Sequence, residues 1–259
     1  MIRVKREYQS WVADETLEDY ALRYAARSYR RWSPGTLANT AIGGISFLAL
    51  EAIGGSLTIN YGFQNAFVAI LLVSILIYLV SLPIAYYAST ANVDIDLLTR
   101  GAGFGYIGST VTSLVYASFT FIFFALEAAI MAQALELSIG LNVVVGYLVC
   151  SLVIIPIAFY GVTLINWLQR WTQPVWAVLL VLPFVFILVR EPAALAEWSA
   201  YSGSGAQGGA FSWLAFGAAT GVLFSLLGQI GEQVDYLRFL PEKNARNRRS
   251  WWTAMLFAG

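Results

Sequence analysis

The chain has 259 residues, of which 59% are hydrophobic and 12% are charged, whereas about a quarter of the residues in a soluble domain are charged. This composition excludes an ordinary soluble domain and predicts an all-α polytopic membrane protein. The chain contains no histidine and one cysteine, Cys150, which excludes Ser-His-Asp chemistry, histidine metal sites and a disulfide framework. The sequence therefore predicts no enzyme, no resident cofactor and no metal site, and it offers no catalytic residue.

Residues 1–35 are polar and charged, and they lack the short apolar core of a cleavable signal peptide. Leu17, Tyr20, Ala21 and Tyr24 follow the i, i+3, i+4, i+7 spacing of an amphipathic helix. Four arginines come next, before the first apolar window: Arg23, Arg27, Arg30 and Arg31. We predict that this segment is a cytosolic lead-in whose helix rests on anionic lipid headgroups.

The first apolar window, residues 37–59, is about as long as the ~20 residues that cross a bilayer. It contains the pairs Gly43-Gly44 and Gly54-Gly55, with Glu51 between them. Each glycine weakens a helix by about 1 kcal/mol relative to alanine, and a carboxylate at membrane depth costs at least ~2.5 kcal/mol. We therefore predict a helix that breaks within the span and lines a site. Close helix packing is the alternative role of the glycines, and we favour it for Gly54-Gly55.

Spans two to six are predicted at residues 66–88, 108–134, 143–160, 171–189 and 211–230, and a seventh window opens at Trp251 and is cut off at Gly259. Every Lys and Arg except Arg190 falls in the N-terminal segment or in the loops with Arg100, Arg170 and Arg238. These segments would share one side of the membrane. Because an excess of Lys and Arg marks the cytoplasmic side, we predict a multi-pass protein of the plasma or inner membrane with a cytoplasmic N-terminus.

Residues 202–209, SGSGAQGG, have the composition of a flexible hinge between spans five and six. Span six contains Gly217, Gly221 and Gly228, so it is interrupted by glycine, as span one is. Paired interruptions at corresponding positions of two repeats point to the midplane site of a transporter. The predicted organisation is a lead-in at 1–35, a first five-helix repeat at 36–190, an external loop at 191–211 and the truncated start of a second repeat at 212–259.

Three local motifs occur in order along the chain. They are DYALR at 19–23 followed by RRW at 30–32, LLTRGAGFGYIG at 97–108, and VDYLRF at 234–239. Together they resemble the signatures of the nucleobase–cation symporters, the purine/cytosine permease and hydantoin/allantoin transporter group. The second motif differs from the family's R-x-S-F-G-x-x-G turn by one extra residue between Arg100 and Phe104. The resemblance extends over nearly all of the chain.

This resemblance implies a five-plus-five inverted repeat of the leucine-transporter type, with the substrate held between broken spans one and six and the faces of spans three and eight. It implies symport of a purine, a pyrimidine or a related planar nitrogen heterocycle with a coupling Na+ or H+. Family members have about twice as many spans, so the chain corresponds to an N-terminal portion, truncated after about six transmembrane helices. Thr40 and Ser46 are candidate oxygen donors for a cation, but the family's sodium site also needs residues from span eight.

Glu127 is the central candidate for substrate binding, and on a helix it shares one face with Thr120 and Phe123. Counted from Phe104, Phe123 falls where the family has a tryptophan that stacks on the planar base. Glu127 falls where the family has a glutamine that hydrogen-bonds the ring. An ionised glutamate only accepts hydrogen bonds, which favours a ligand rich in N–H groups or makes binding proton-dependent. The alternative is a structural role, in which Glu127 pairs with a donor on another helix.

The predicted substrate site also includes Glu51, Gly228 and Gln229. Glu51 is expected at nearly the same depth as Glu127, within ~5 Å along the membrane normal at 1.5 Å per residue, which offers a route to proton coupling. A position in the outer water funnel, away from Glu127, is an equal alternative for Glu51. Gly228 and Gln229 lie in span six, where an interrupted helix would expose backbone groups to a ligand or cation.

Two other functions stay open at this point. The same fold can serve as the sensory input module of a signalling protein, with a fused domain further downstream, or it can transport another small solute such as an amino acid. The expected partners are the substrate, a coupling cation and the lipid bilayer, with no nucleic acid.

Overall fold

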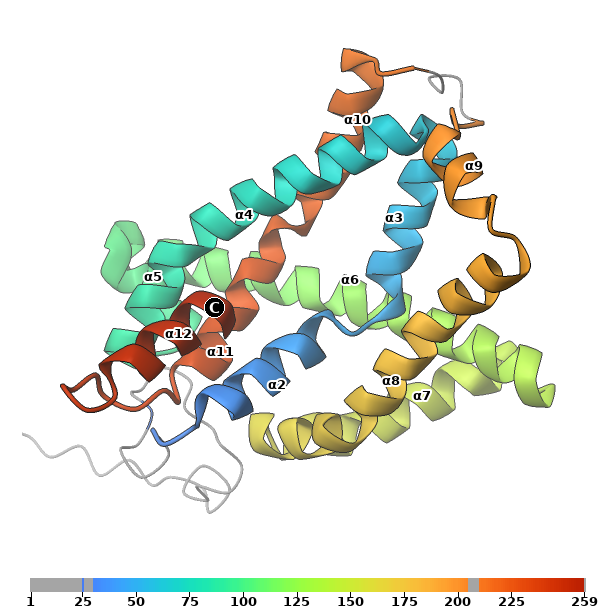
Figure 1. Cartoon of the computed structure of the whole chain (residues 1–259). Helices are drawn as coiled ribbons and strands as arrows, with labels where there is room; N and C mark the ends of the chain where they lie inside the picture. The colour runs from blue at the N-terminus through green and yellow to red at the C-terminus, as the bar shows by residue number, and fades with distance from the viewer. Residues whose placement is uncertain (1–24, 26–29, 205–209, 259) are drawn as a thin grey trace, which may run out of the picture.

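The computed structural model describes residue 25, residues 30–204 and residues 210–258, and within these ranges every regular element is a helix (Figure 1). The elements are α2 (Pro34–Ile45), α3 (Leu48–Tyr61), α4 (Phe63–Ala91), α5 (Ile95–Thr99), η2 (Arg100–Phe104), α6 (Gly105–Ile139), α7 (Val143–Phe159), α8 (Val162–Arg190), α9 (Ala194–Ala200), α10 (Trp213–Phe224), η3 (Ser225–Gly231), α11 (Glu232–Leu237) and α12 (Arg248–Ala258). The amphipathic helix predicted around Tyr20 and the DYALR part of the first motif, residues 19–23, lie outside the described residues.

Four helical stretches in the described ranges are long and apolar enough to cross a membrane. They are α4, the run from α5 through α6 (Ile95–Ile139), α8, and the run from α10 through α11 (Trp213–Leu237). The bent pair α2 and α3 is a candidate fifth span, and α7 is an apolar helix of 17 residues, slightly short of the ~20 that a perpendicular span needs. Because a helix satisfies its own backbone groups, four to five long apolar helices indicate a polytopic membrane protein.

The local sequence explains where several helices begin. Ser33 is the N-cap of α2, and its side chain accepts a hydrogen bond from the N–H of Thr36, with Pro34 in the first turn. Asp94 caps α5 and Asn142 caps α7 in the same way. Short polar residues therefore fix the starts of helices whose interiors are almost wholly apolar.

The fifth span begins earlier than predicted. α8 starts at Val162, well before residue 171, so Arg170 lies on an exposed turn of this helix and not in a loop as we expected. The apolar window failed to include this first part because it carries the amides of Asn166 and Gln169 and the charge of Arg170. The side chain of Asn166 donates to Thr36 O (3.0 Å) and Thr40 Oγ1 (2.6 Å) of α2. Polar residues that serve helix packing in this way lower the hydropathy of the segment, so it was not predicted as part of the span.

The buried apolar residues form two main clusters that lie among a subset of the helices. One cluster joins α2, α4, α11 and α12, and the other joins α3, α4 and α10. The residues that make the contacts include Leu37, Ala85, Leu237, Trp251 and Met255 in the first cluster and Leu57, Ala69, Val73, Ala219 and Leu223 in the second. We call α2, α3, α4, α10, α11 and α12 the core bundle. No described buried member of either cluster comes from α6, α7 or α8.

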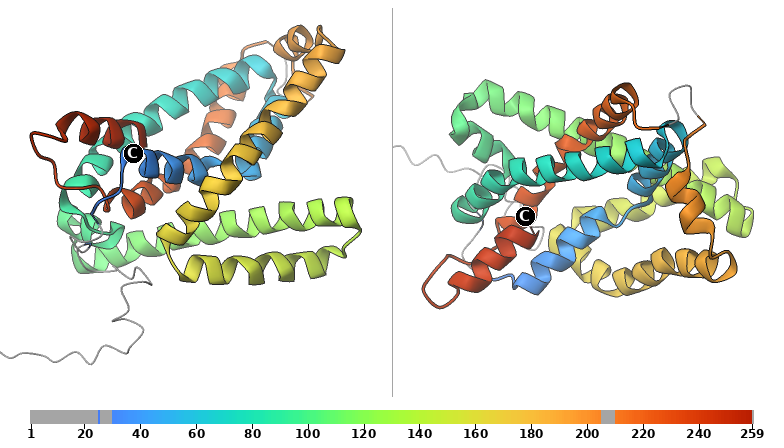
Figure 2. Two further views of the ribbon diagram at one scale, coloured as in Figure 1. Left: turned by 60° about the horizontal axis from the view of Figure 1, so that its bottom comes forward. Right: turned by 45° about the horizontal axis from the view of Figure 1, so that its top comes forward.

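Helices α6 and α7 pack on each other as an antiparallel pair outside the core bundle (Figure 2, left). Their approach is close because Gly146 of α7 faces Ala132 of α6: a Cβ on Gly146 would lie 3.0 Å from the Cβ of Ala132. α6 meets the core bundle mainly at α3 and η3, the two places where the bundle's own helices are interrupted.

The cationic residues gather at one end of the molecule, which we call the basic end. It contains the start of α2, the end of α4, the α5–η2 turn and the α11–α12 loop, whereas the α3–α4 turn and α9 lie at the opposite end (Figure 1). Of the described cations, Arg170, within α8, and Arg190, at its last position, lie outside these elements.

A tight turn at Gly62 joins α3 to α4 at the opposite end. Gly62 has φ +81°, and residues 201–204 run across it: the N–H of Phe63 donates to Tyr201 O (2.9 Å) and that of Ser204 to Ile59 O (2.7 Å). A Cβ on Gly62 would lie 2.6 Å from the backbone O of Ser202. The turn thus requires glycine twice, for its left-handed backbone and for the approach of a second backbone.

We expect Gly62→Ala to lower the free energy of unfolding by roughly 2–6 kcal/mol, the sum of about 1–3 kcal/mol for an alanine in this sparsely allowed backbone region and about 1–3 kcal/mol for an overpacked contact. Thermal unfolding of the purified protein in detergent measures the loss. The matched control is Gly140→Ala, because Gly140 also has a positive φ (+69°) but a Cβ there would meet nothing within 4 Å. Equal losses in the two variants would contradict the assignment of the clash.

Candidate functional site

Span one is interrupted between α2 and α3, whose axes are bent by 50°. α2 ends at Ile45 and α3 begins at Leu48, so the break falls on Ser46 and Phe47, just after Gly43-Gly44. The predicted break of this helix is therefore confirmed. Ser46 closes the end of α2 from within: its hydroxyl donates to Ile42 O (2.5 Å) and its N–H to Gly43 O (3.4 Å).

The second glycine pair of span one, Gly54-Gly55, lies inside the regular helix α3. A Cβ on either glycine would meet nothing within 4 Å. The close packing that we favoured for this pair is thus wrong within the described chain, because this face of α3 has no neighbouring helix.

Glu127 of α6 caps the broken helix from outside. The N-cap residue of α3 is Phe47, which has no side-chain oxygen, and the N–H of Ala49 donates instead to Glu127 Oε1 at 2.7 Å. A carboxylate at a helix N-terminus is stabilised by a charge-assisted bond and by the helix dipole. The N–H of Ala49 is thus the donor on another helix that the structural alternative for Glu127 predicted. It occupies only one of the two carboxylate oxygens. No donor from the described residues contacts Oε2, which leaves it available to a ligand.

Span six is interrupted at a matching position. Residues Ser225–Gly231 form the 3₁₀ segment η3 between α10 and α11, and a mid-span 3₁₀ segment often marks a hinge. The amide Nε2 of Gln229 donates to Gly44 O at 3.3 Å, directly across to the end of α2. A Cβ on Gly44 would lie 3.4 Å from Glu232 Oε2. The two interruptions therefore face each other, with polar side chains of span six against the carbonyl end of α2.

Three phenylalanines meet where α6 approaches these interruptions: Phe119 and Phe123 of α6, and Phe47 at the break of span one. The ring of Phe123 is 4.6 Å from the ring of Phe119 and meets Phe47 edge to face at 5.7 Å. Phe119 in turn covers Gly228, where a Cβ would lie 2.9 Å from two ring atoms. The sequence predicted Phe123 and Gly228 but missed Phe47 and Phe119. The signals that identify them are the position of Phe47 directly after the break and that of Phe119 one turn before Phe123.

The two remaining predicted residues lie at the edge of this group. Thr120 is exposed, and its hydroxyl donates to the carbonyl of Tyr116 on its own helix (2.7 Å). Glu51 is exposed in the first turn of α3, two residues after Ala49, whose N–H donates to Glu127. Four predicted residues are thus gathered around the interruptions: Phe123, Glu127, Gly228 and Gln229. Glu51 adjoins them. Thr120 is near them only because of its position on α6.

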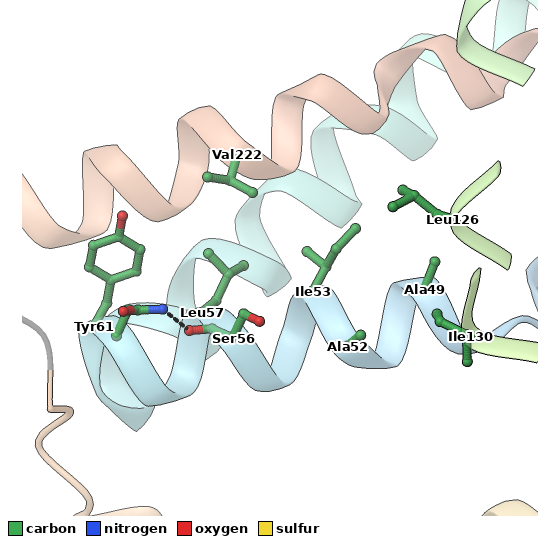
Figure 3. Close-up of a pocket in the computed structure, with 10 residues that line it drawn as sticks. Ala49, Ala52, Ile53, Ser56, Leu57, Tyr61, Leu126, Ile130 and Val222 are labelled. Carbon is green, nitrogen blue, oxygen red and sulfur yellow. Dashed lines mark hydrogen bonds between the residues drawn. The ribbon is translucent and has the colours of Figure 1, made fainter. Parts of the chain in front are cut away.

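An elongated pocket of about 290 Å³ leads from the break toward the opposite end of the molecule (Figure 3). Its walls come from α3, α6 and α10, and they are mainly apolar, with Ala49, Ile53, Leu126 and Val222 among them. The far end carries polar groups, including the amide of Asn60, which donates to Ser56 O at 2.8 Å. The pocket therefore begins at Ala49, the residue that Glu127 binds, and becomes polar away from the site.

The oxygen donors predicted for a cation are engaged within the protein. Thr40 donates its hydroxyl to Thr36 O (3.2 Å) and accepts from Asn166, and Ser46 donates to Ile42 O as described above. In the part of the chain that the structure describes, no group of three His, Cys, Asp or Glu residues is arranged to hold a metal ion.

No family model matches this chain, and it is similar to no curated protein and to no solved structure that we compared with it. Its function is therefore argued from the residues of the site.

Proposed function

We propose that the protein is the transport module of a secondary active transporter that moves a purine, a pyrimidine or a related planar nitrogen heterocycle with a coupling cation. The observation that carries the proposal is the carboxylate of Glu127 on the N-terminus of a broken helix, 2.7 Å from the N–H of Ala49, with a second oxygen directed to no protein donor of the described chain. A fixed acceptor at a helix break is the kind of group that orients a small polar ligand in a transporter.

The aromatic residues around this acceptor support a planar ligand. The ring of Phe123 lies within 6 Å of the rings of Phe47 and Phe119, and aromatic rings bind flat heterocycles by stacking and edge contacts. Glu127 would accept ring N–H groups, and Gln229, whose Nε2 already donates to Gly44 O, would accept a further N–H through its side-chain carbonyl. A ligand rich in N–H groups fits this set better than a carboxylate-bearing amino acid, because Glu127 and Glu51 would repel an anion.

The packing supports alternating access of the leucine-transporter type. The core bundle has its own buried clusters, and α6 touches it chiefly where spans one and six are interrupted. α8 also packs on α2 through the hydrogen bonds of Asn166, so in this proposal the core bundle rocks against α6 and α8 around the site. In this arrangement the basic end faces the cytoplasm, the pocket of Figure 3 leads outward, and H+ or Na+ is the coupling ion.

The proposal is tested by uptake into cells or proteoliposomes that contain the full chain. We expect saturable uptake of a radiolabelled nucleobase, driven by an inward Na+ or H+ gradient, and competition by at least one of cytosine, uracil, hypoxanthine, allantoin and hydantoin. Competition by amino acids but by none of these heterocycles would overturn the substrate class. Saturable binding without uptake would favour a sensory input module.

A further inference from the structure

Three aromatic rings surround one ammonium group at the basic end. The Nζ of Lys243 lies 4.8 Å from the ring centre of Trp251, 5.0 Å from that of Trp252 and 5.5 Å from that of Tyr86. The rings also contact one another: Trp251 meets both Tyr86 and Trp252 edge to face, and Tyr86 stacks on Trp252. A cation within about 6 Å of a ring centre is attracted by the ring's quadrupole, most strongly for tryptophan. We call Tyr86, Trp251 and Trp252 the cation cage.

The cage joins parts of the chain that are distant in sequence. Tyr86 lies near the end of α4, whereas Trp251 and Trp252 lie in the first turns of α12. Lys243 comes from the loop between α11 and α12. α11 carries Glu232 and follows η3, so this loop is directly connected to the interruption of span six. The contact with Lys243 therefore ties the loop that follows span six to the end of span two.

The first part of this loop has other anchors, and they do not depend on Lys243. The side chain of Asn92, at the end of α4, donates to Arg238 O (2.8 Å) and Leu240 O (3.1 Å), and it is 1% exposed. The ring of Phe239 stacks on Trp32 at 4.9 Å, and the N–H of Trp32 donates to Phe239 O.

After Leu240, charged side chains make most of the described contacts between the loop and other elements. They include the ion pair of Glu242 with Arg30 (3.6 Å), the hydrogen bond from the N–H of Trp251 to Asn247 O (2.7 Å) and the caged ammonium of Lys243. The ion pair is long, and its glutamate is exposed, so it contributes little. The cage is a contact that joins this half of the loop to the end of α4.

We propose that the cation cage is a binding site for an alkylammonium group, that Lys243 is its resident occupant, and that this contact latches the α11–α12 loop onto the end of α4. The latch is a property of the folded chain and does not depend on what the protein transports. Its physical requirement is a positive charge between rings, and the lysine stem alone does not satisfy it.

Amide hydrogen exchange of the full chain in detergent or nanodiscs tests the latch through the rate in residues 241–248. We expect Lys243→Met, which keeps the stem but removes the charge, to raise this rate about fivefold, the loss of a modest cation–π contact. Lys243→Arg should stay near the wild type, because it keeps the cation. Arg246→Met is the matched control: Arg246 is an exposed cation of the same loop, and no ring of the described chain faces it. It should change nothing.

Chemical rescue tests the cage as a site. In Lys243→Ala, added propylammonium or tetramethylammonium should slow exchange in 241–248 again, whereas an equal concentration of sodium chloride should not. The rescue should be lost in Lys243→Ala/Tyr86→Leu and retained in Lys243→Ala/Tyr86→Phe, since only the former removes a ring. Unchanged exchange in Lys243→Met, or exchange in Lys243→Arg as fast as in Lys243→Met, would overturn the latch. Rescue by sodium chloride would overturn the cage as an alkylammonium site.

Discussion

Glu127→Leu is expected to lower the affinity for the heterocyclic ligand by about ten- to hundredfold while the helices stay formed. The variant removes a hydrogen bond to a charged group, worth roughly 1.5–3 kcal/mol, from a position that leucine fills without a large change in volume. It also leaves the N–H of Ala49 without its acceptor, so the free energy of unfolding should fall by about 1–3 kcal/mol. Equilibrium binding of the radiolabelled ligand and thermal unfolding measure the two effects separately.

Two controls accompany this variant. Glu127→Gln keeps an oxygen for the N–H of Ala49 but adds a donor, so it should fold normally and shift the preference among heterocycles toward those that offer an acceptor. Glu136→Gln removes an exposed carboxylate near the far end of the same helix and should behave as the wild type. Unchanged binding in both Glu127 variants would remove this residue from the site.

Gly228→Val is expected to reduce uptake at least tenfold with only a modest loss of stability. A Cβ on Gly228 would lie 2.9 Å from ring atoms of Phe119, so this ring has to move, and Phe119 packs on Phe123 at 4.6 Å. Overpacking of this kind costs about 1–3 kcal/mol, and here the displaced ring belongs to the aromatic group that would contact the substrate. Uptake and thermal unfolding are measured on the same preparation.

Gly221→Val is the matched control for this prediction. Gly221 lies in α10, two turns before Gly228 along the same span, and a Cβ there would meet nothing within 4 Å. The Gly221→Val variant should retain uptake. Both variants replace a glycine by valine in span six, but only the side chain at position 228 would contact α6. If the two variants lose the same activity, the effect belongs to the helix in general and not to the site.

The sequence predicted the features of the site that depend on composition within one segment. The glycine pair and Glu51 in an apolar window predicted a broken helix, and the break follows Gly43-Gly44. Gln229 was selected because it stands beside glycines in span six, and it donates to Gly44 O. In each case, a residue that is costly in a lipid-exposed helix signalled the place where the helix is interrupted.

What the sequence could not predict are contacts between distant segments. The N-terminus of α3 is capped by Glu127, 78 residues away, and no local pattern specifies that partner. The early start of α8 was missed because Asn166 is a polar residue that packs against α2. Its low hydropathy excluded this part of the helix from the predicted span. Gly54-Gly55 was expected to pack closely and faces open space, since a small residue permits a close approach but does not require one.

The central claim is that a small ligand binds between the broken spans beside α6, and protection of an introduced cysteine tests it most directly. In a Cys150→Ala background, Thr120→Cys places a thiol on the face of α6 that carries Phe123 and Glu127, and Glu136→Cys places one near the far end of the same helix. A saturating nucleobase that the protein transports should slow alkylation of the thiol at position 120 at least fivefold and leave the thiol at position 136 unaffected. Equal alkylation at position 120 with and without the ligand would contradict the account.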